Sequence, residues 1–291
     1  MEKTELIKKV RKIEIRTRGL SRQLFSGEYH SAFKGHGMAF SEVREYKLGD
    51  DIRTIDWNVT ARFNHPYVKI FEEERELTLI LLVDVSSSEM FGTQVQFKKD
   101  LITELCGVLA FSAMQNNDKI GVIFFSDKIE KFIPPKKGRT HILMIIHELI
   151  EFKPTGTGTN IALALRYLRN VIKKRSIVFM LSDFIDQGFE DALKISGKKH
   201  DTIAIQIYDK REEELPDIGL VRALDAESGM MSWVDTSDYR LRELYTSQWL
   251  SRQKQLNDTF IKNNIDVIKL RTDQSYVAPL MNFFKKRGHR R

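Results

Sequence analysis

The stretch Glu-Leu-Thr-Leu-Ile-Leu-Leu-Val-Asp-Val-Ser-Ser-Ser-Glu-Met, residues 76–90, decides the fold of this 291-residue chain. Residues 77–83 form a nearly unbroken apolar run between a charge cluster and a serine cluster. Such a run is typical of a strand that is buried on both faces of a parallel sheet. The stretch therefore predicts a central strand of an α/β sheet.

Short polar side chains follow this strand at every second position, in the order Asp84, Ser86 and Ser88. In open α/β sheets, sites form beyond the carboxyl ends of the strands, so these oxygens are expected to meet in a crevice there. Hard oxygen ligands suit Mg²⁺. Asp-x-Ser-x-Ser alone is a weak signal, because serine and aspartate also cap helices and a helix is expected to begin near Thr93.

Composition excludes several classes of protein. The hydrophobic content is 42% and the charged content is 30%, and no apolar run approaches the length of a membrane-spanning helix. A single cysteine excludes an internal disulfide framework, and the N-terminus lacks the apolar region of a signal peptide. We therefore expect a cytoplasmic protein without an integral membrane segment.

The formal charge of +7 is concentrated at the two ends of the sequence. Residues 1–25 hold eight basic and three acidic side chains, and residues 285–291 hold five basic ones. A basic chain can bind nucleic acid, but the body lacks interleaved aromatic residues and a basic recognition motif. We expect no nucleic acid, and we interpret the ends as solvated or as docking to an acidic partner.

Hydrophobic periodicity predicts alternating helices and strands along most of the chain. Helices are predicted for residues 4–25, 94–114, 141–150, 161–173, 189–198, 238–262 and 276–286, and sheet strands for residues 77–83, 120–125, 129–133, 177–181, 202–208 and 266–270. This alternation indicates an α/β fold with a doubly wound, mostly parallel six-stranded sheet in the order 3-2-1-4-5-6. Its first and fourth strands then flank the topological switch.

The chain is expected to contain three parts. Residues 1–26 form an N-terminal amphipathic helix, which packs on its own domain or docks a partner. Residues 27–76 form a small β-rich module, and residues 77–291 form the sheet domain. Residues 209–236 interrupt the alternation with a hairpin around Glu227-Ser228-Gly229. Because neither short-stranded segment can bury its own apolar face, residues 209–236 are a candidate to complete the module.

A second group of oxygen donors follows the fourth strand, which ends in Ser182-Asp183. The Gly-Thr loop at residues 155–160 precedes a helix, but it lacks the Gly-x-Gly-x-x-Gly and Gly-Lys-Ser/Thr patterns, so nucleotide binding is discounted. Its threonine hydroxyls remain available as ligands. The candidate metal donors are therefore Asp84, Ser86, Ser88, Thr159 and Asp183.

The module carries a longer signature, which reads Gly49-Asp50-Asp51-x-Arg53-x-Ile55-Asp56-Trp57-x-x-x-Ala61-Arg62, followed by Val68-Lys69 and Glu72-Glu73-Glu74-Arg75. It resembles the signature of the domain-of-unknown-function 58 family, whose proteins carry a von Willebrand factor A domain just after it. We interpret the charges of the signature as ion pairs that hold the module to the sheet.

The resemblance also implies a role for the five donors, which match the metal-ion-dependent adhesion site of von Willebrand factor A domains. There the hydroxyls of Ser86, Ser88 and Thr159 would touch Mg²⁺, while Asp84 and Asp183 would act directly or through water. Mn²⁺ and Ca²⁺ are alternative cations. The partner that the resemblance implies is a MoxR-type AAA+ ATPase, for which the chain would be a chaperone-like adaptor with an unidentified client.

Binding is favoured over catalysis. Gly-x-Ser-x-Gly, His-Glu-x-x-His and the P-loop are absent, although a metal with an open position could activate water, so a metal-dependent hydrolase stays an alternative. A nucleic-acid-binding accessory protein that uses the basic ends is a further alternative. Neutral hydroxyl ligands leave Mg²⁺ under-neutralised, which favours an incoming Asp or Glu from another protein. We therefore expect a metal-dependent protein–protein interaction module rather than an enzyme.

Overall fold

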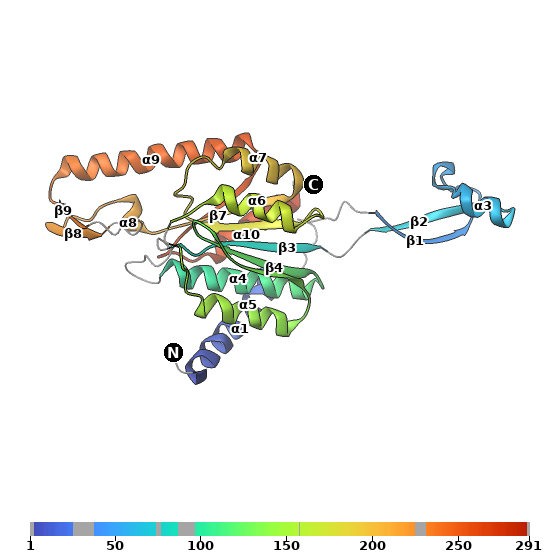
Figure 1. Cartoon of the computed structure of the whole chain (residues 1–291), viewed down its shortest axis with the longest axis horizontal. Coiled ribbons are helices and arrows are strands. Elements are labelled where there is room, and N and C mark those ends of the chain that lie inside the picture. The colour runs from blue at the N-terminus through green and yellow to red at the C-terminus, as the bar shows by residue number, and fades with distance from the viewer. Residues whose placement is uncertain are drawn as a thin grey trace. The chain divides into compact units, whose positions relative to one another are not determined.

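The computed structural model describes residues 3–25, 38–73, 77–86, 97–156, 158–224 and 231–289 (Figure 1). The chain divides into two compact units. Residues Met1–Ala32 and Thr78–Arg291 form the first, called here the sheet unit, and residues Phe33–Leu77 form the second, called here the signature module.

The sheet unit is organised around a six-stranded sheet. Its strands are β3 (Thr78–Asp84), β4 (Lys119–Phe125), β5 (Ile129–Lys136), β6 (Ile177–Ser182), β7 (Asp201–Tyr208) and β10 (Asp266–Arg271). The order in the sheet is β10-β7-β6-β3-β4-β5, and every neighbouring pair is parallel except the β4–β5 hairpin. This is the predicted order 3-2-1-4-5-6, with the topological switch between β3 and β6.

Helices cover both faces of the sheet (Figure 1). One face carries α4 (Lys98–Gln115), α5 (Arg139–Glu151), α1 (Lys3–Phe25) and α10 (Val277–His289), and the other carries α6 (Ile161–Val171), α7 (Glu190–Lys199) and α9 (Tyr239–Lys262). Ile80, Val178 and Ala204 belong to the core under α6, α7 and α9, while Phe179 faces the opposite side and contacts Phe284 of α10. Burial on both faces explains why these strands are continuous apolar runs.

The N-terminal helix packs on its own unit. Thr17 and Ser21 of α1 are buried. A Cβ atom on Gly107 of α4 would lie only 3.1 Å from Cγ2 of Thr17, so α1 and α4 pack closely at this glycine. Arg139 of α5 forms an ion pair with Glu14 of α1 at 2.7 Å. The packed alternative is therefore confirmed for the described residues of this helix.

Two local predictions for the sheet unit are wrong. The helical spacing of Phe97, Leu101 and Leu105 predicts that they share a buried face, but Phe97 is 54% exposed, and the next residue, Lys98, is fully buried. The C-terminal basic residues were expected to be solvated or to dock an acidic partner; Lys285 and Lys286 are exposed, but Arg287 is 8% exposed. Its guanidinium pairs with Asp266 at 2.8 Å and also with Asp201, because α10 ends beside the first residues of β7 and β10.

The segment that interrupts the alternation forms a helix and a hairpin. These are α8 (Lys210–Glu213), β8 (Leu220–Leu224) and β9 (Met231–Asp235), and β8 and β9 pair as a separate antiparallel sheet. The predicted turn Glu227-Ser228-Gly229 lies outside the described residues. Packing of residues 209–236 against residues 38–76 stays a prediction.

The signature module is a two-stranded antiparallel ribbon with two short helices between its strands. The elements are β1 (Met38–Glu45), the 3-10 helix η1 (Ile52–Thr54), α3 (Trp57–Phe63) and β2 (Tyr67–Glu73). Gly49 turns the chain with φ of +107°, a conformation that favours glycine. Asp51 caps η1 and Asp56 caps α3 by accepting backbone N–H groups.

The aspartates of the signature pair with cations inside the module. Both oxygens of Asp50 accept hydrogen bonds from Arg44, at 2.7 and 2.8 Å, and these bonds lower the pKa of the Asp50 carboxyl. Asp56 lies 3.5 Å from the ammonium of Lys69. The described pairs therefore join the turn and α3 to the ribbon, which differs from the expected role of holding the module to the sheet.

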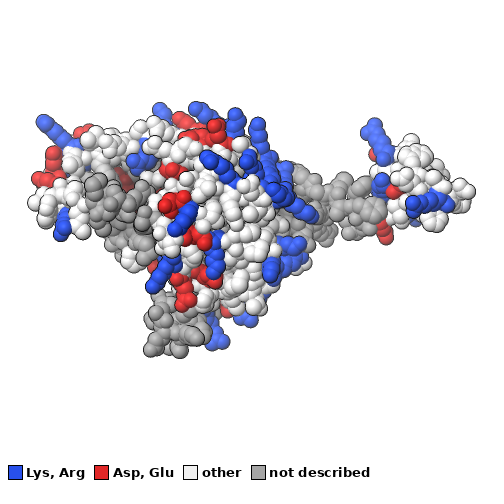
Figure 2. All heavy atoms as spheres, viewed as in Figure 1, with Lys and Arg blue, Asp and Glu red and all other residues white. Residues whose placement is uncertain are grey.

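Charges of both signs are spread over the visible face of the sheet unit, and basic side chains gather over α6 and α7 (Figure 2). Burial lowers the pKa of the Lys199 ammonium. The nearby charges of Lys173 and Arg169 lower it further. Within the described ranges, no helix has the length and apolarity to cross a membrane.

Candidate metal-binding site

Two neighbouring strand ends form the base of the site. Asp84 ends β3 and is 1% exposed, and Ser182 ends β6 beside it. The hydroxyl of Ser182 donates to Oδ2 of Asp84 at 2.7 Å, and the backbone N–H of Ser86 donates to Oδ1 at 3.0 Å. The Asp84 carboxylate is thus oriented by groups from both strands at the topological switch.

The Gly-Thr loop brings a third chain segment to the same carboxylate. The hydroxyl of Thr159 donates to Oδ2 of Asp84 at 3.4 Å. The next residue, Asn160, donates its backbone N–H to the carbonyl of Ser126 and caps α6 with its side chain. Thr159 is therefore positioned by the start of α6 and by the β4–β5 turn.

Glu130 of β5 holds the beginning of this loop. Its Oε1 accepts the backbone N–H groups of Gly156 at 2.7 Å and Thr155 at 3.0 Å, and its Oε2 accepts the hydroxyl of Thr155 at 2.8 Å. Partial burial alone would raise the pKa of Glu130, but these hydrogen bonds outweigh it and lower the pKa. A Cβ at Gly156 would lie 1.8 Å from Oδ1 of Asp127, so the close approach of loop and turn requires glycine.

Asp183 is engaged by different partners from those of Asp84. Its Oδ1 accepts the backbone N–H of Ile185 at 3.1 Å, and its Oδ2 lies 3.0 Å from the ammonium of Lys98. The same ammonium lies 2.6 Å from Oε1 of Glu212 in α8. Burial raises the pKa of Glu212, and the Lys98 charge partly offsets this. Lys98 thus supplies a buried positive charge between two carboxylates.

Asp84 has only neutral donors among its described hydrogen-bond partners. Burial, together with the charge of Asp183, raises the pKa of Asp84 to about 7. Asp84 and Ser86 also line a cavity of about 20 Å³, whose other lining residues are mainly apolar and do not include Thr159 or Asp183. A divalent cation fits this setting, because it would compensate a buried carboxylate and would find hard carboxylate and hydroxyl oxygens around it.

The structure brings Asp84, Ser86 and Thr159 into hydrogen-bonding contact, and Asp183 directly follows Ser182. Ser88 lies outside the described residues. The role of all five as metal ligands stays a prediction. In the described part of the chain, no group of three or more His, Cys, Asp and Glu side chains could hold a metal ion, so a cation here would depend on hydroxyl ligands.

Sequence reasoning missed two residues of the site. Ser182 was noted only as a polar strand end, although its place one residue before Asp183 marks it as a neighbour of Asp84 across the switch. Lys98 carried a weak signal, because it stands four residues before the buried Ile102 and so shares its helix face. Cys106 is fully buried, as expected of a core thiol, and burial raises its pKa.

The profile of the family described as "Protein of unknown function DUF58" matches residues 42–255. A similar relative is the uncharacterized protein Rv1480 of Mycobacterium tuberculosis (strain H37Rv), which is 29% identical over 264 residues. That match covers 90% of this chain and 83% of the relative. The similarity therefore includes both the signature module and most of the sheet unit.

Two solved structures are similar to this chain. One is an aerotolerance-related membrane protein from Bacteroides fragilis, with 15% identity and a TM-score of 0.50, covering 74% of this chain and all of that one. The other is the VWA (von Willebrand factor A) domain of SpRpn10, with 9% identity and a TM-score of 0.41, covering 72% and 95%. At 15% identity the similarity to the Bacteroides fragilis protein concerns the fold alone. The superposition on the SpRpn10 domain is too loose to support an argument, so our assignment of the fold is based on the strand order.

Proposed function

The chain belongs to the DUF58 family of proteins of unknown function, and we propose that it is a metal-dependent protein–protein interaction module. One observation carries the proposal: the loop at Thr159 and the end of β6 at Ser182, both distant in sequence, bring hydroxyl oxygens to the buried carboxylate of Asp84 at the topological switch. Open α/β sheets bind their ligands at this position.

The cation that we propose is Mg²⁺, with Mn²⁺ and Ca²⁺ as alternatives. Asp84, Ser86 and Thr159 would hold it, together with Ser88. Asp183 would act through water, because its Oδ2 is already paired with the buried ammonium of Lys98. When bound, the cation supplies a centre of positive charge that neutral hydroxyls leave incompletely neutralised, and a carboxylate of a partner protein is the matching ligand.

The partner that we propose is a MoxR-type AAA+ ATPase, for which the chain would act as an adaptor. The support for this partner is the resemblance of the signature module. A metal-dependent hydrolase stays the alternative. It would be supported by substrate turnover that the wild type shows and the Asp84→Asn variant lacks.

The test compares the wild type with Asp84→Asn, which keeps the size of the side chain and removes its charge. A cation that binds only the folded state stabilises it by about 2.7 kcal/mol at a hundredfold excess over Kd. We expect Mg²⁺ to raise the melting temperature of the wild type, and EDTA to reverse this and to release the ATPase in a pull-down. The variant should show neither response.

Asp118→Asn is the matched control, because Asp118 is 2% exposed and precedes β4 at the opposite edge of the sheet. It should keep the full Mg²⁺ response whatever its effect on stability. If Asp84→Asn also keeps the Mg²⁺ response and captures the ATPase, the proposed site is wrong.

A further inference from the structure

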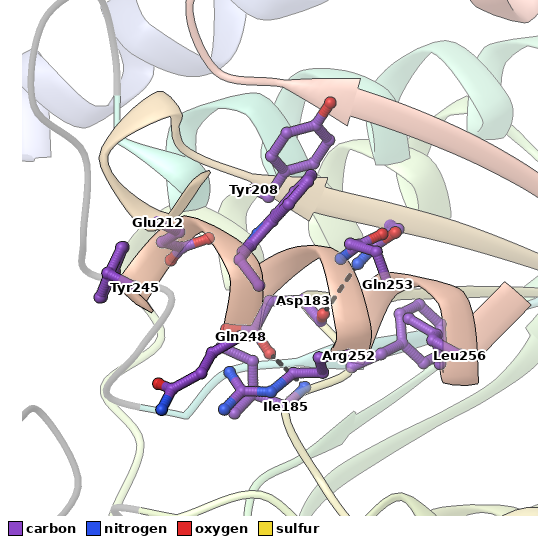
Figure 3. A pocket seen from close by; sticks show the side chains of 12 residues that line it. Asp183, Ile185, Tyr208, Glu212, Tyr245, Gln248, Arg252, Gln253 and Leu256 are labelled. Carbon is purple, nitrogen blue, oxygen red and sulfur yellow. Dashed lines mark hydrogen bonds between the residues drawn. The ribbon is translucent and has the colours of Figure 1, made fainter. Parts of the chain in front are cut away.

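A second pocket adjoins the candidate metal site on the side of α9 (Figure 3). It has a volume of about 100 Å³, and Asp183 belongs to both the pocket and the metal site. Trp249 and Tyr208 form an aromatic part of its wall, with ring centroids 5.6 Å apart. Because a single water needs only about 10–15 Å³, the pocket has room for a side chain.

The charges around this pocket are unequally compensated. Glu212 and Asp183 line it, but both are paired with the buried ammonium of Lys98. Arg252 of α9 also lines it and is exposed, and it makes no hydrogen bond or ion pair with any residue that the structure describes. Lys98 carries one charge for these two carboxylates, and Arg252 is the cationic group among the described lining residues that has no such partner.

A polar ligand is also favoured by Gln206, which is 1% exposed and lines the pocket. Within the described part of the chain its Oε1 has no hydrogen-bond partner, although such buried groups are rarely left unpaired. Figure 3 shows Gln248 and Arg252 extending from α9 beside Ile185, so polar side chains border the pocket as well as its aromatic wall.

We propose that this pocket is a second contact for the partner segment that the metal captures, and that Arg252 receives a second acidic side chain of that segment. The inference rests on the proposed function. A bound cation and Arg252 would present two positive centres, and Asp183 belongs to both the metal site and the pocket, so the matching ligand is an acidic peptide with two carboxylates. A guanidinium pairs with a carboxylate through two parallel hydrogen bonds, which would select acidic over amide side chains.

Trp249 provides a direct readout of the pocket. The sequence contains three tryptophans, so the double variant Trp57→Phe/Trp233→Phe leaves Trp249 as the only one. The probes are synthetic glycine-based peptides with one aspartate or with two aspartates at increasing separations. With Mg²⁺ present, we expect one of the two-aspartate peptides to change the Trp249 emission and to bind more tightly than the one-aspartate peptide.

Arg252→Gln in this background should weaken the two-aspartate peptide about tenfold, as expected for the loss of a charge-assisted pair, and leave the one-aspartate peptide unchanged. Arg240→Gln is the control, since Arg240 is an exposed arginine of the same helix that does not line the pocket. Equal affinities in the two variants, or equal Trp249 responses to both peptides, would overturn the inference while leaving metal-dependent capture standing. Absence of Mg²⁺-dependent binding by every peptide would overturn both.

Discussion

The ammonium of Lys98 lies 3.0 Å from Oδ2 of Asp183, and both side chains are shielded from solvent. The two residues are 85 positions apart, and they join the first turn of α4 to the end of β6. Since Glu212 shares the same ammonium, this pair also connects the candidate metal site with the pocket beside α9.

Lys98→Met should destabilise the metal-free protein by about 3–5 kcal/mol, because it leaves Asp183 and Glu212 buried without their cation. Urea unfolding measures this change. Mg²⁺ should stabilise the variant more than it stabilises the wild type, since removal of a positive charge next to the site strengthens cation binding. Lys194→Met is the control, because Lys194 is an exposed lysine of α7 that lines neither the pocket nor the cavity at Asp84. Equal Mg²⁺ responses in wild type and Lys98→Met would show that Lys98 has a structural role alone.

Gly156→Ala should reduce the Mg²⁺ response with a smaller effect on the core of the sheet unit. The added methyl group would collide with Oδ1 of Asp127 and with Oγ of Ser126, which lies 2.3 Å away, so the loop that carries Thr159 must shift. Gly158→Ala is a matched control, because its methyl group would have only Asp127 Cβ nearby, at 3.9 Å. Melting curves with and without Mg²⁺ compare the two variants. If Mg²⁺ raises the melting temperature of the two variants equally, the position of the loop does not affect cation binding.

The burial of His200 predicts that the folded protein loses stability in acid. It is 1% exposed, and neither ring nitrogen has a hydrogen-bond partner among the described residues. Burial, aided by the charges of Lys199 and Arg175, lowers its pKa from 6.5 to about 4. Between these values the unfolded state binds the proton and the folded state does not, so stability falls as the pH falls from about 6.5 to about 4.

His200→Leu should therefore flatten the dependence of the unfolding free energy on pH in that window. Chemical denaturation at a series of pH values measures the slope. His147→Gln serves as the control, since His147 is an exposed residue of α5, and it should keep the slope of the wild type. A slope that His200→Leu leaves unchanged would contradict the assignment.

Truncation at the C-terminus should show that Arg287 contributes to the stability of the fold and that the residues after it do not. A chain that ends at Arg287 should unfold like the full chain, whereas one that ends at Lys286 should lose about 1–3 kcal/mol, because Asp201 and Asp266 lose a largely buried partner. Arg287→Met in the full chain should reproduce the second result. Similar stability of the two truncated chains would mean that these ion pairs contribute little.

The sequence by itself determined the α/β order of the sheet. Each strand of β3, β4, β6 and β7 is a local apolar run, and burial of such a run on both faces leaves few alternatives to a parallel sheet. It also placed Asp84 and Asp183 at one edge of the sheet, because strand ends at a topological switch meet there whatever the side-chain packing is. Thr159 was included only for the hydroxyl of its loop.

The pairing of the buried charges could not be predicted before the fold was known. Lys98 and Arg287 are basic residues near helix ends, and sequence reasoning interpreted the C-terminal cluster as solvated or as docking to an acidic partner. Their burial depends on carboxylates that the fold brings from distant strands and from α8. A buried charge is stable only beside its partner, and that partner is set by packing between elements rather than by any local pattern. Among the described residues, the same packing gives Asp84 only neutral hydrogen-bond donors, which makes it the carboxylate of the site best suited to a cation.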